Sequence, residues 1–505
     1  MKLLLKISWR NIQRHKGKSL VIGIILFLGA LIMTVGNGVI TGMDTGLREN
    51  IMNRFVGHIV IVAKDQDYDN VIFTPMGKDV MVIPRIKEVK EVLDKQDYIK
   101  QYLPICRGFT LILNDDRDIG HALLLGVNFD EYQKMFNNNV ILMEGKFPAR
   151  GERGILVTRG TRKRLYNQID LWIVPRGYKL KEENLTVEAL ENLSKLLLRD
   201  NIVVMGSSST STQMDIRTTV KGVIKYEYLD NYWKGFNIID IESFREAFNY
   251  VTAHDAGTVI SADKQKILKS DNLDDMFNEE VITTSVSKTS QYRLKSIMSK
   301  VKKTGTVNTD EGTYNLVFIK IKDPSKIEEY TEKLNKALLK GKTGARAITW
   351  KKAAGQLADM ATMIRGALFG FVMLIFFVAI IIIMNTLSMA AMERVTEIGM
   401  MRAVGAQRLF IGRMFFIETS ILTGVFGGLG IIVGTIIVII LNAMSITTDN
   451  NILQLLFGGN IFRPLITLSD ILTGIIELCL VAAIATIYPI RIARRITPLD
   501  AIARD

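Results

Sequence analysis

Two short segments of this 505-residue sequence end like a phosphate-binding loop. Gly17-Lys18-Ser19 and Gly341-Lys342-Thr343 each supply the Gly-Lys-Ser/Thr that holds a nucleotide phosphate and its magnesium ion. That loop also needs a glycine five residues before the Gly-Lys pair, and the residues there are Ile12 and Lys336. Both segments therefore fail as nucleotide sites.

The other residues that could perform catalysis or bind a metal are scattered. The histidines lack a pair at helical spacing, so solvated or strand positions are expected for them rather than a metal site. They are His15, His58, His121 and His254. Residues 207–209 are serines without the glycines of a nucleophile elbow. With only Cys106 and Cys479, a disulfide framework and a four-cysteine zinc site are excluded. We predict no catalytic residue, no metal and no cofactor bound by this chain.

The composition indicates a membrane protein with a large water-facing part. Lys and Arg number 64 against 51 Asp and Glu, a net charge of +13, yet 48% of residues are hydrophobic and the mean hydropathy is +0.20. A soluble basic protein seldom combines these values, and a disordered or collagen-like chain cannot.

Runs without charged residues locate the transmembrane helices. Residues 19–43, 366–392 and 419–448 contain no Asp, Glu, Lys or Arg, and each run exceeds the roughly 20 residues that cross a bilayer as a helix. A fourth apolar run holds one acid, Glu477. An acid within a membrane span indicates a functional residue or one with a buried partner; alternatively, Glu477 faces a water-filled crevice. We predict helices at residues 20–42, 366–389, 417–443 and 466–488. The first is expected to be an uncleaved anchor, because no signal-peptidase site follows it.

The basic residues predict the orientation. Residues 1–19 hold six basic residues and no acid, whereas 390–413 and 489–505 each hold four basic and two acidic residues. These segments carry +10 of the +13, and the positive-inside rule places all of them in the cytoplasm. Both termini are then cytoplasmic, residues 43–364 lie outside, and 444–465 form a short outer loop. The charge marks topology, so nucleic acid is not expected as a partner.

The outer block has the pattern of an α+β domain. It begins with a predicted strand, helix and strand and closes with another such set. The predicted segments are 57–62, 84–93 and 102–113, then 314–321, 324–339 and 345–349. We expect residues 57–105 and 306–350 to form one discontinuous subdomain, with 106–305 inserted as another. The fold class is therefore four transmembrane α-helices with a large α+β extracytoplasmic domain between the first and second.

The predicted cytoplasmic loop 390–413 contains the most informative motif. In Arg394–Ala406 apolar residues recur near helical spacing among charged ones. The pattern fits a short amphipathic helix parallel to the membrane, or a polar helix that only joins two spans.

That segment resembles the R-x-x-E-I-G-x-x-[RK]-A-x-G-A signature of the MacB, LolC/LolE and FtsX-type permeases of ABC transporters. Residues 7–12 resemble the family's amphipathic N-terminal W-R-N helix, which is expected over the cytoplasmic segment 1–19, and 488–502 are similar to its C-terminal tail. Glu418 and the glycines after it match the third span, where the glycines are expected to let another helix pack closely. These are Gly424, Gly427, Gly428, Gly430 and Gly434.

The resemblance implies a permease subunit that works with a separate dimer of cytoplasmic ATPase subunits, which bind ATP and Mg. It also implies a second permease subunit, in a homo- or heterodimer. The loop helix would dock in a groove of the ATPase, with charged residues on the rim, Ile398 and Met400 filling the contact, and Gly405 ending the helix. The expected coupling residues are Glu393, Arg394, Glu397, Ile398, Met400, Arg402, Ala403, Gly405 and Ala406.

Members of this family transmit ATP-driven motion through the first two spans to the outer domain. Residues 43–56 and 351–365 would extend those helices as a stalk, or serve as linkers. Without a fused ATPase and with a large outer block, extraction of lipoproteins from the bacterial inner membrane is favoured, with transfer to a periplasmic carrier.

The segment 175–217 would be a hook that docks the carrier through Pro175, Arg176 and Lys179, or a solvated helical excursion with a helix at 186–198. Efflux of small molecules or peptides and regulation of cell-wall hydrolases are the alternatives within the family. Outside it, the alternative is a membrane-tethered binding or sensory protein without transport.

Overall fold

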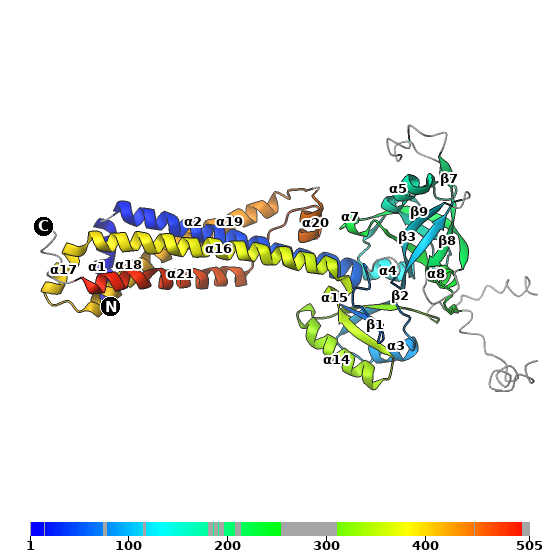
Figure 1. The fold of residues 1–505 in the computed structure, drawn as a ribbon, viewed down its shortest axis with the longest axis horizontal. Coiled ribbons are helices and arrows are strands. Elements are labelled where there is room, and N and C mark those ends of the chain that lie inside the picture. The colour runs from blue at the N-terminus through cyan, green and yellow to red at the C-terminus, as the bar shows by residue number, and fades with distance from the viewer. Residues whose placement is uncertain are drawn as a thin grey trace, which may run out of the picture. The chain divides into compact units, whose positions relative to one another are not determined.

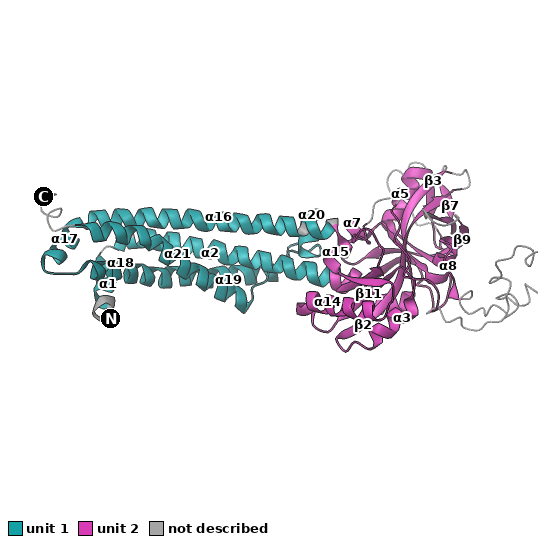
Figure 2. Ribbon diagram, turned by 60° about the horizontal axis from the view of Figure 1, so that its bottom comes forward, with its two compact units in different colours: residues 1–51, 356–505 teal, residues 52–355 magenta. Residues whose placement is uncertain are grey.

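The computed structural model describes residues 2–14, 16–73, 78–114, 118–179, 185, 190, 196–207, 214–253, 311–448 and 450–496. They fall into two compact units, drawn in two colours in Figure 2. The first unit comprises Met1–Ile51 and Gln356–Asp505 and is mainly helical. The second unit, Met52–Gly355, contains the β-sheet.

Four helical segments are long and apolar enough to cross a membrane. They are Ser19–Val56, Leu357–Glu393, Arg408–Ala443 and Leu468–Arg495. At 1.5 Å per residue, each is longer than a hydrocarbon layer of about 30 Å requires. With a mixed-sheet domain in the chain between the first and second segments, the predicted fold class is confirmed.

The first unit contains these segments, the first of them as far as Ile51, as a bundle with short helices at its ends (Figure 1). The long helices are α2 (Lys16–Leu47), α16 (Gln356–Glu393), α18 (Arg408–Leu422), α19 (Gly428–Ala443) and α21 (Leu468–Arg495). Two π-helical stretches, η1 (Arg48–Val56) and η5 (Thr423–Gly427), continue α2 and join α18 to α19. The short helices are α1 (Lys2–Arg14), α17 (Val395–Ala403) and α20 (Asn451–Phe457).

A capping box starts the last long helix. The Thr467 hydroxyl accepts a hydrogen bond from the Asp470 N–H at 3.3 Å, and the Asp470 carboxylate accepts one from the Thr467 N–H at 2.7 Å. Each side chain satisfies an N–H that the helix start leaves unpaired. The capping box therefore fixes the residue at which α21 begins.

The glycines after Glu418 do not all serve helix packing. A Cβ at Gly434 would lie 2.9 Å from Thr34 Cβ, and one at Gly427 would lie 2.6 Å from Leu478 Cδ1. At Gly430 it would overlap the carbonyl oxygen of Phe27. The expectation is wrong for Gly424 and Gly428, where a Cβ would meet no atom within 4 Å. Their four-residue spacing places them together on one side of the helix, away from the side that contacts α2 and α21.

The second unit is built on a ten-stranded mixed sheet of order β12-β1-β11-β2-β3-β10-β5-β9-β4, in which β8 also pairs with β2 and β9. Its strands are β1 (Ile59–Ala63), β2 (Ile99–Leu113), β3 (Ile119–Val127), β4 (Val140–Gly145), β5 (Ile155–Thr158), β8 (Asn201–Ser207), β9 (Asp215–Tyr226), β10 (Phe236–Asp240), β11 (Leu316–Ile321) and β12 (Ala345–Thr349). A separate parallel pair consists of β6 (Leu171–Ile173) and β7 (Leu197–Arg199).

Two hydrophobic cores lie along this sheet. The helices of this unit are α3 (Ile86–Asp94), α4 (Phe129–Met135), α5 (Arg159–Ile169), α7 (Asp230–Trp233), α8 (Ile241–Ala247), η4 (Pro324–Lys326), α14 (Ile327–Lys340) and α15 (Trp350–Ala354). Helices α3 and α14 pack on β1, β11 and β12, and α5 and α8 pack with the second core. The strands and helices predicted for residues 57–113 and 314–349 are confirmed. Strand β2 pairs with β11 through its first half and with β3 through its second, so one strand belongs to both cores.

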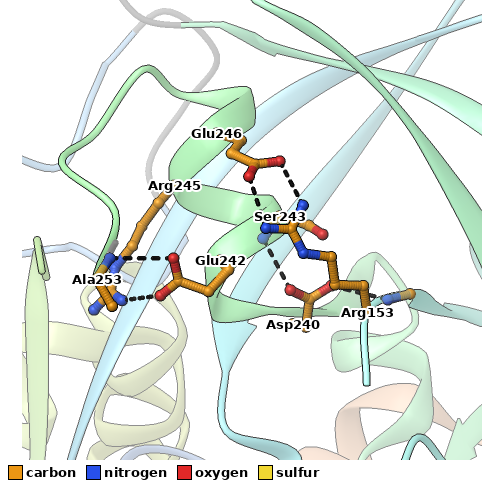
Figure 3. A network of polar contacts seen from close by, with 8 residues as sticks. Arg153, Asp240, Glu242, Ser243, Arg245, Glu246 and Ala253 are labelled. Carbon is orange, nitrogen blue, oxygen red and sulfur yellow. Dashed lines mark hydrogen bonds and ion pairs between the residues drawn. The ribbon is translucent and has the colours of Figure 1, made fainter. Parts of the chain in front are cut away.

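A polar network surrounds the start of α8 (Figure 3). Asp240 accepts hydrogen bonds from the N–H groups of Ser243 and Gly154, each at 2.9 Å, and Arg153 forms two bonds to Glu246 at 2.9 and 2.8 Å. Glu242 pairs with Arg245 and accepts from the Ala253 N–H at 3.2 Å. The Arg245 Nε donates to the Thr313 carbonyl at 3.0 Å.

These bonds hold Ala253 and Thr313 to α8, on either side of the stretch 254–310 that lies outside the described residues. The chain therefore leaves and re-enters this part of the fold beside one short helix.

Candidate functional site

The segments that carry the sequence motifs meet at one end of the first unit. Helices α1, α17, the start of α18 and the end of α21 lie there together (Figures 1 and 2). They share a core that draws residues from both ends of the sequence. Its buried members are Ala391, Val395, Ile398, Ile411, Met414, Phe415, Ala493 and Ile496. Ile7, Met401 and Ile490 pack against them, whereas residues 497–502 of the tail motif lie outside the described residues.

Helix α17 ends in a glycine turn. Gly405 has φ +100°, the Gly405 N–H donates to the Arg402 carbonyl at 3.0 Å, and the Ala406 N–H donates to the Met401 carbonyl at 3.0 Å. These two bonds form a Schellman motif, which needs a left-handed residue that glycine adopts without strain. The helix therefore ends at the glycine expected to end it.

Arg394 is buried, and its placement on the rim of an ATPase contact is wrong. The Arg394 side chain is 7% exposed, and its Nη1 lies 3.0 and 3.1 Å from the two oxygens of Glu418, which is 8% exposed. Asn11 donates a third hydrogen bond to that carboxylate at 3.0 Å. A buried charge requires such a partner, so the pair directs both side chains into the protein. It joins α1, α17 and α18.

Ile398 does not fill an external contact, because it is 1% exposed and belongs to the shared core. The apolar side chains that project are Met400, 61% exposed, and Val404, 91% exposed. Two residues along a helix correspond to about 200°, so Ile398 and Met400 point to opposite sides. Val404 is not among the coupling residues expected from the sequence, although its four-residue spacing from Met400 indicates that both lie on one face of the helix. We name Met400, Ala403, Val404 and Gly405, all exposed, the α17 tip.

The other charged residues of the loop have different surroundings. Glu397 lies 3.3 Å from the Arg14 guanidinium of α1, and Arg402 donates to the Ile496 carbonyl after α21. Glu393 is exposed at the end of α16. The charges of α17 thus tie it to the two ends of the chain, and its tip projects.

Glu477 has a polar neighbour on another span. It is half-buried on α21 and accepts a hydrogen bond from the Asn37 amide of α2 at 3.2 Å. Two turns away, the Thr41 hydroxyl donates to Asp470 at 2.8 Å. A polar seam therefore joins the first and last spans.

The candidate docking residues of the outer block lie in a turn. Pro175 is buried, and Arg176 and Lys179 are exposed around Gly177, which has φ +80°. The Arg176 N–H donates to the Val220 carbonyl at 3.1 Å, which ties the turn to β9. Most of the segment 180–213, including most of the predicted helix 186–198, lies outside the described residues. Its last two positions, 197 and 198, are strand because β7 pairs with β6.

The described residues include no group of three or more His, Cys, Asp or Glu side chains that could hold a metal ion. His58 is buried, and its Nδ1 accepts from the Ile321 N–H at 2.9 Å. Burial lowers the pKa of His58 to about 4, so its ring is neutral at pH 7. Thr343 donates to the Leu338 carbonyl at the end of α14, whereas a phosphate loop opens a helix.

Residues 369–498 match the family described as FtsX-like permease C-terminal. The chain is also 30% identical over 143 residues to an uncharacterized ABC transporter permease, MJ1507, of Methanocaldococcus jannaschii. That alignment covers 27% of this chain and 35% of the relative, so the chain spans about a third of the length of this curated relative.

Two solved structures are similar at low overall scores. One is the extracellular domain of the noncanonic ABC-type transporter YknZ from Gram-positive bacteria, with TM-score 0.28 and 9% identity, covering 57% of this chain and 98% of that one. The other is the periplasmic region of MacB from Actinobacillus actinomycetemcomitans, with TM-score 0.28 and 12% identity, covering 60% and 94%.

Proposed function

Because this chain carries an FtsX-like permease domain at residues 369–498 and is homologous to an ABC transporter permease, we propose that it is the membrane subunit of such a transporter. ATP and Mg bind to a separate cytoplasmic ATPase dimer, and a second permease subunit completes the complex. The observation that carries the proposal is the shared core under α17, which holds the motif helix rigidly and leaves its tip exposed.

The α17 tip is the part that enters the ATPase. Met400 and Val404 offer apolar surface on a helix whose opposite face is buried, and an apolar contact surrounded by charges gives both affinity and specificity. A force on the tip passes to α18 through the Arg394–Glu418 pair and to α1 through Asn11 and Arg14. Closure of the ATPase dimer would thus move several helices as one body.

In this proposal α17 and both termini are cytoplasmic, and residues 43–364 lie on the outer side of the cytoplasmic (inner) membrane. The basic residues at 1–19, 390–413 and 489–505 support that orientation.

For the cargo, we propose lipoproteins extracted from that membrane by mechanotransmission and passed to a periplasmic carrier at the turn of Pro175, Arg176 and Lys179. The size of the outer block supports this choice over a regulator of cell-wall hydrolases.

Co-purification with the ATPase tests the coupling. We expect Met400→Asp with Val404→Asp to abolish capture of the ATPase, because two carboxylates would be buried without partners. Met444→Asp is the matched control, since Met444 is 63% exposed at the end of α19, away from the tip. Gly405→Trp should also block capture. Wild-type capture and ATPase activity in the double variant would refute the coupling site, and absence of any ATPase partner would favour a tethered binding or sensory protein.

Depletion tests the cargo separately. If lipoproteins are the cargo, acylated proteins should accumulate in the cytoplasmic membrane when the chain is removed. Normal sorting of acylated proteins together with intact ATPase capture would point to efflux or to regulation of cell-wall hydrolases.

A further inference from the structure

Helix α1 has one face docked on the bundle and one face exposed. On the docked face, the buried Ser8 hydroxyl donates to the Met414 carbonyl at 3.3 Å, and Asn11 bonds Glu418 at 3.0 Å. On the opposite face Lys6 and Arg10 are exposed, and Trp9 is 48% exposed. Helical spacing groups these three side chains together, one turn apart. The exposed face of α1 thus presents an indole ring beside two cationic side chains.

The docked residues fix the depth of α1 in the membrane. Met414 and Glu418 follow Arg408, the start of α18, by about 9 and 15 Å along the helix axis. The charge-free run begins only after Glu418, so the part of α18 beside α1 precedes the hydrocarbon segment. A Cβ at Gly412 of α18 would lie 2.7 Å from the guanidinium of Arg494 on the neighbouring helix α21, so a charge of α21 lies at the same level. Helix α1 therefore lies at the depth of the lipid headgroups.

The chemistry of the exposed face suits a phosphate diester at that depth. Residues 1–19 contain six basic residues and no acid. Within the part of the chain that the structure describes, neither Lys6 nor Arg10 has an acidic partner, whereas Arg14 pairs with Glu397. Trp prefers the membrane interface because its ring is apolar and its N–H is polar. Lys and Arg near an anionic leaflet each add attraction to its phosphates.

We propose that Lys6, Trp9 and Arg10 form a binding site for the headgroups of anionic phospholipids in the leaflet next to α17. The lipid would press α1 against α18 and keep the Asn11 amide bonded to the Glu418 carboxylate. It would thereby stabilise the end of the bundle that carries α17. The site requires only that the bundle lies in a membrane, so it stands or falls independently of ATPase binding.

The test uses the purified full chain without any ATPase, in nanodiscs of phosphatidylcholine with or without phosphatidylglycerol. Lys6→Gln with Arg10→Gln is compared with Lys322→Gln with Lys340→Gln, which removes two exposed charges from the second unit. Bound phosphatidylglycerol is counted by native mass spectrometry. Each basic side chain contributes a factor of about five, so we expect the α1 variant to bind phosphatidylglycerol about 25-fold more weakly and the control variant to bind it as the wild type does.

The position of Trp9 provides a second readout. The fluorescence difference between wild type and Trp9→Phe reports on Trp9 alone, and we expect brominated phosphatidylglycerol to quench it more than brominated phosphatidylcholine does. Equal phosphatidylglycerol binding by the two double variants, or equal quenching by both lipids, overturns the proposal. Shielding of Trp9 by added ATPase with no response to either lipid would identify a protein contact instead and would also overturn it.

Discussion

The buried pair between Arg394 and Glu418 makes the sharpest quantitative prediction. Both side chains are more than nine-tenths buried, and the carboxylate accepts three hydrogen bonds at 3.0–3.1 Å from Arg394 and Asn11. Glu418→Gln keeps the shape but leaves the guanidinium charge buried without compensation. Breaking a buried pair in this way costs about 3–5 kcal/mol. For a helical unit of this size, that corresponds to a loss on the order of 10 °C in the unfolding midpoint.

The same reasoning predicts recovery in a double variant. Arg394→Met with Glu418→Leu removes both charges and fills the space with apolar groups, which is often neutral for a buried pair. We expect its stability to lie within about 1–2 kcal/mol of the wild type, the remainder reflecting the unsatisfied Asn11 amide. The single variants should therefore be less stable than the double variant, a coupling that a double-mutant cycle measures.

The assay is thermal unfolding of the full chain in nanodiscs, and the measured quantity is the folded fraction as the temperature rises. An exposed pair of the same unit is the control: Arg365 contacts Asp44 with side chains 44% and 31% exposed, and Arg365→Gln should cost less than about 1 kcal/mol. If Glu418→Gln proves as mild as Arg365→Gln, or if the double variant is no more stable than the singles, the buried-pair argument is wrong.

The remaining predictions concern helix packing, pH, the α17 tip and the lipid face. Gly430→Val should unfold the bundle or lower its stability by several kcal/mol, because its Cβ would overlap the Phe27 carbonyl, whereas Gly424→Val should be near neutral in the same assay because nothing lies within 4 Å. The pKa of His58 is about 4 when folded and about 6.5 when unfolded, so the unfolded state binds more protons between these values and stability falls as the pH drops from 6.5 to 4, by about 3 kcal/mol. Denaturation followed across this pH range should show that loss in wild type and much less of it in His58→Asn; an equal slope in both would assign the pH dependence elsewhere. Charged substitutions in the α17 tip should remove ATPase capture, and neutral substitutions of Lys6 and Arg10 should weaken binding of anionic lipid, each against its control variant.

The spans and much of the sheet follow from local pattern. A long run without charged residues is stable only as a helix that is buried or lies in a membrane. The apolar pattern of 57–113 and 314–349 predicts the observed strands and helices, because each segment buries one face locally. The π-helical stretches η1 and η5 could not be predicted, since they continue helical sequence without a marker of their own.

The roles of Arg394 and Ile398 could not be predicted because they depend on partners distant in sequence. A charged residue in a loop is normally exposed, and only Glu418 and Asn11, which the fold brings beside Arg394, make burial possible. One signal was available: Glu418 stands at the edge of a charge-free run, where an acid needs a cation, and the motif loop supplies that cation. The rotation of α17 that buries Ile398 follows from the same pair.

Burial thus divides the motif into two parts that experiments can separate. The α17 tip is exposed and contributes little to the shared core, so Met400 and Val404 variants should lose ATPase capture at unchanged unfolding temperature. Arg394 and Ile398 lie inside, so their variants should lose stability first and capture only as the helix becomes disordered. The double variant of the buried pair distinguishes these effects, because it restores stability without a charge between α17 and α18. If it also restores ATPase activity in the complex, rigid attachment of α17 is what coupling requires; if stability returns and activity does not, the charge pair itself has a part in transmission.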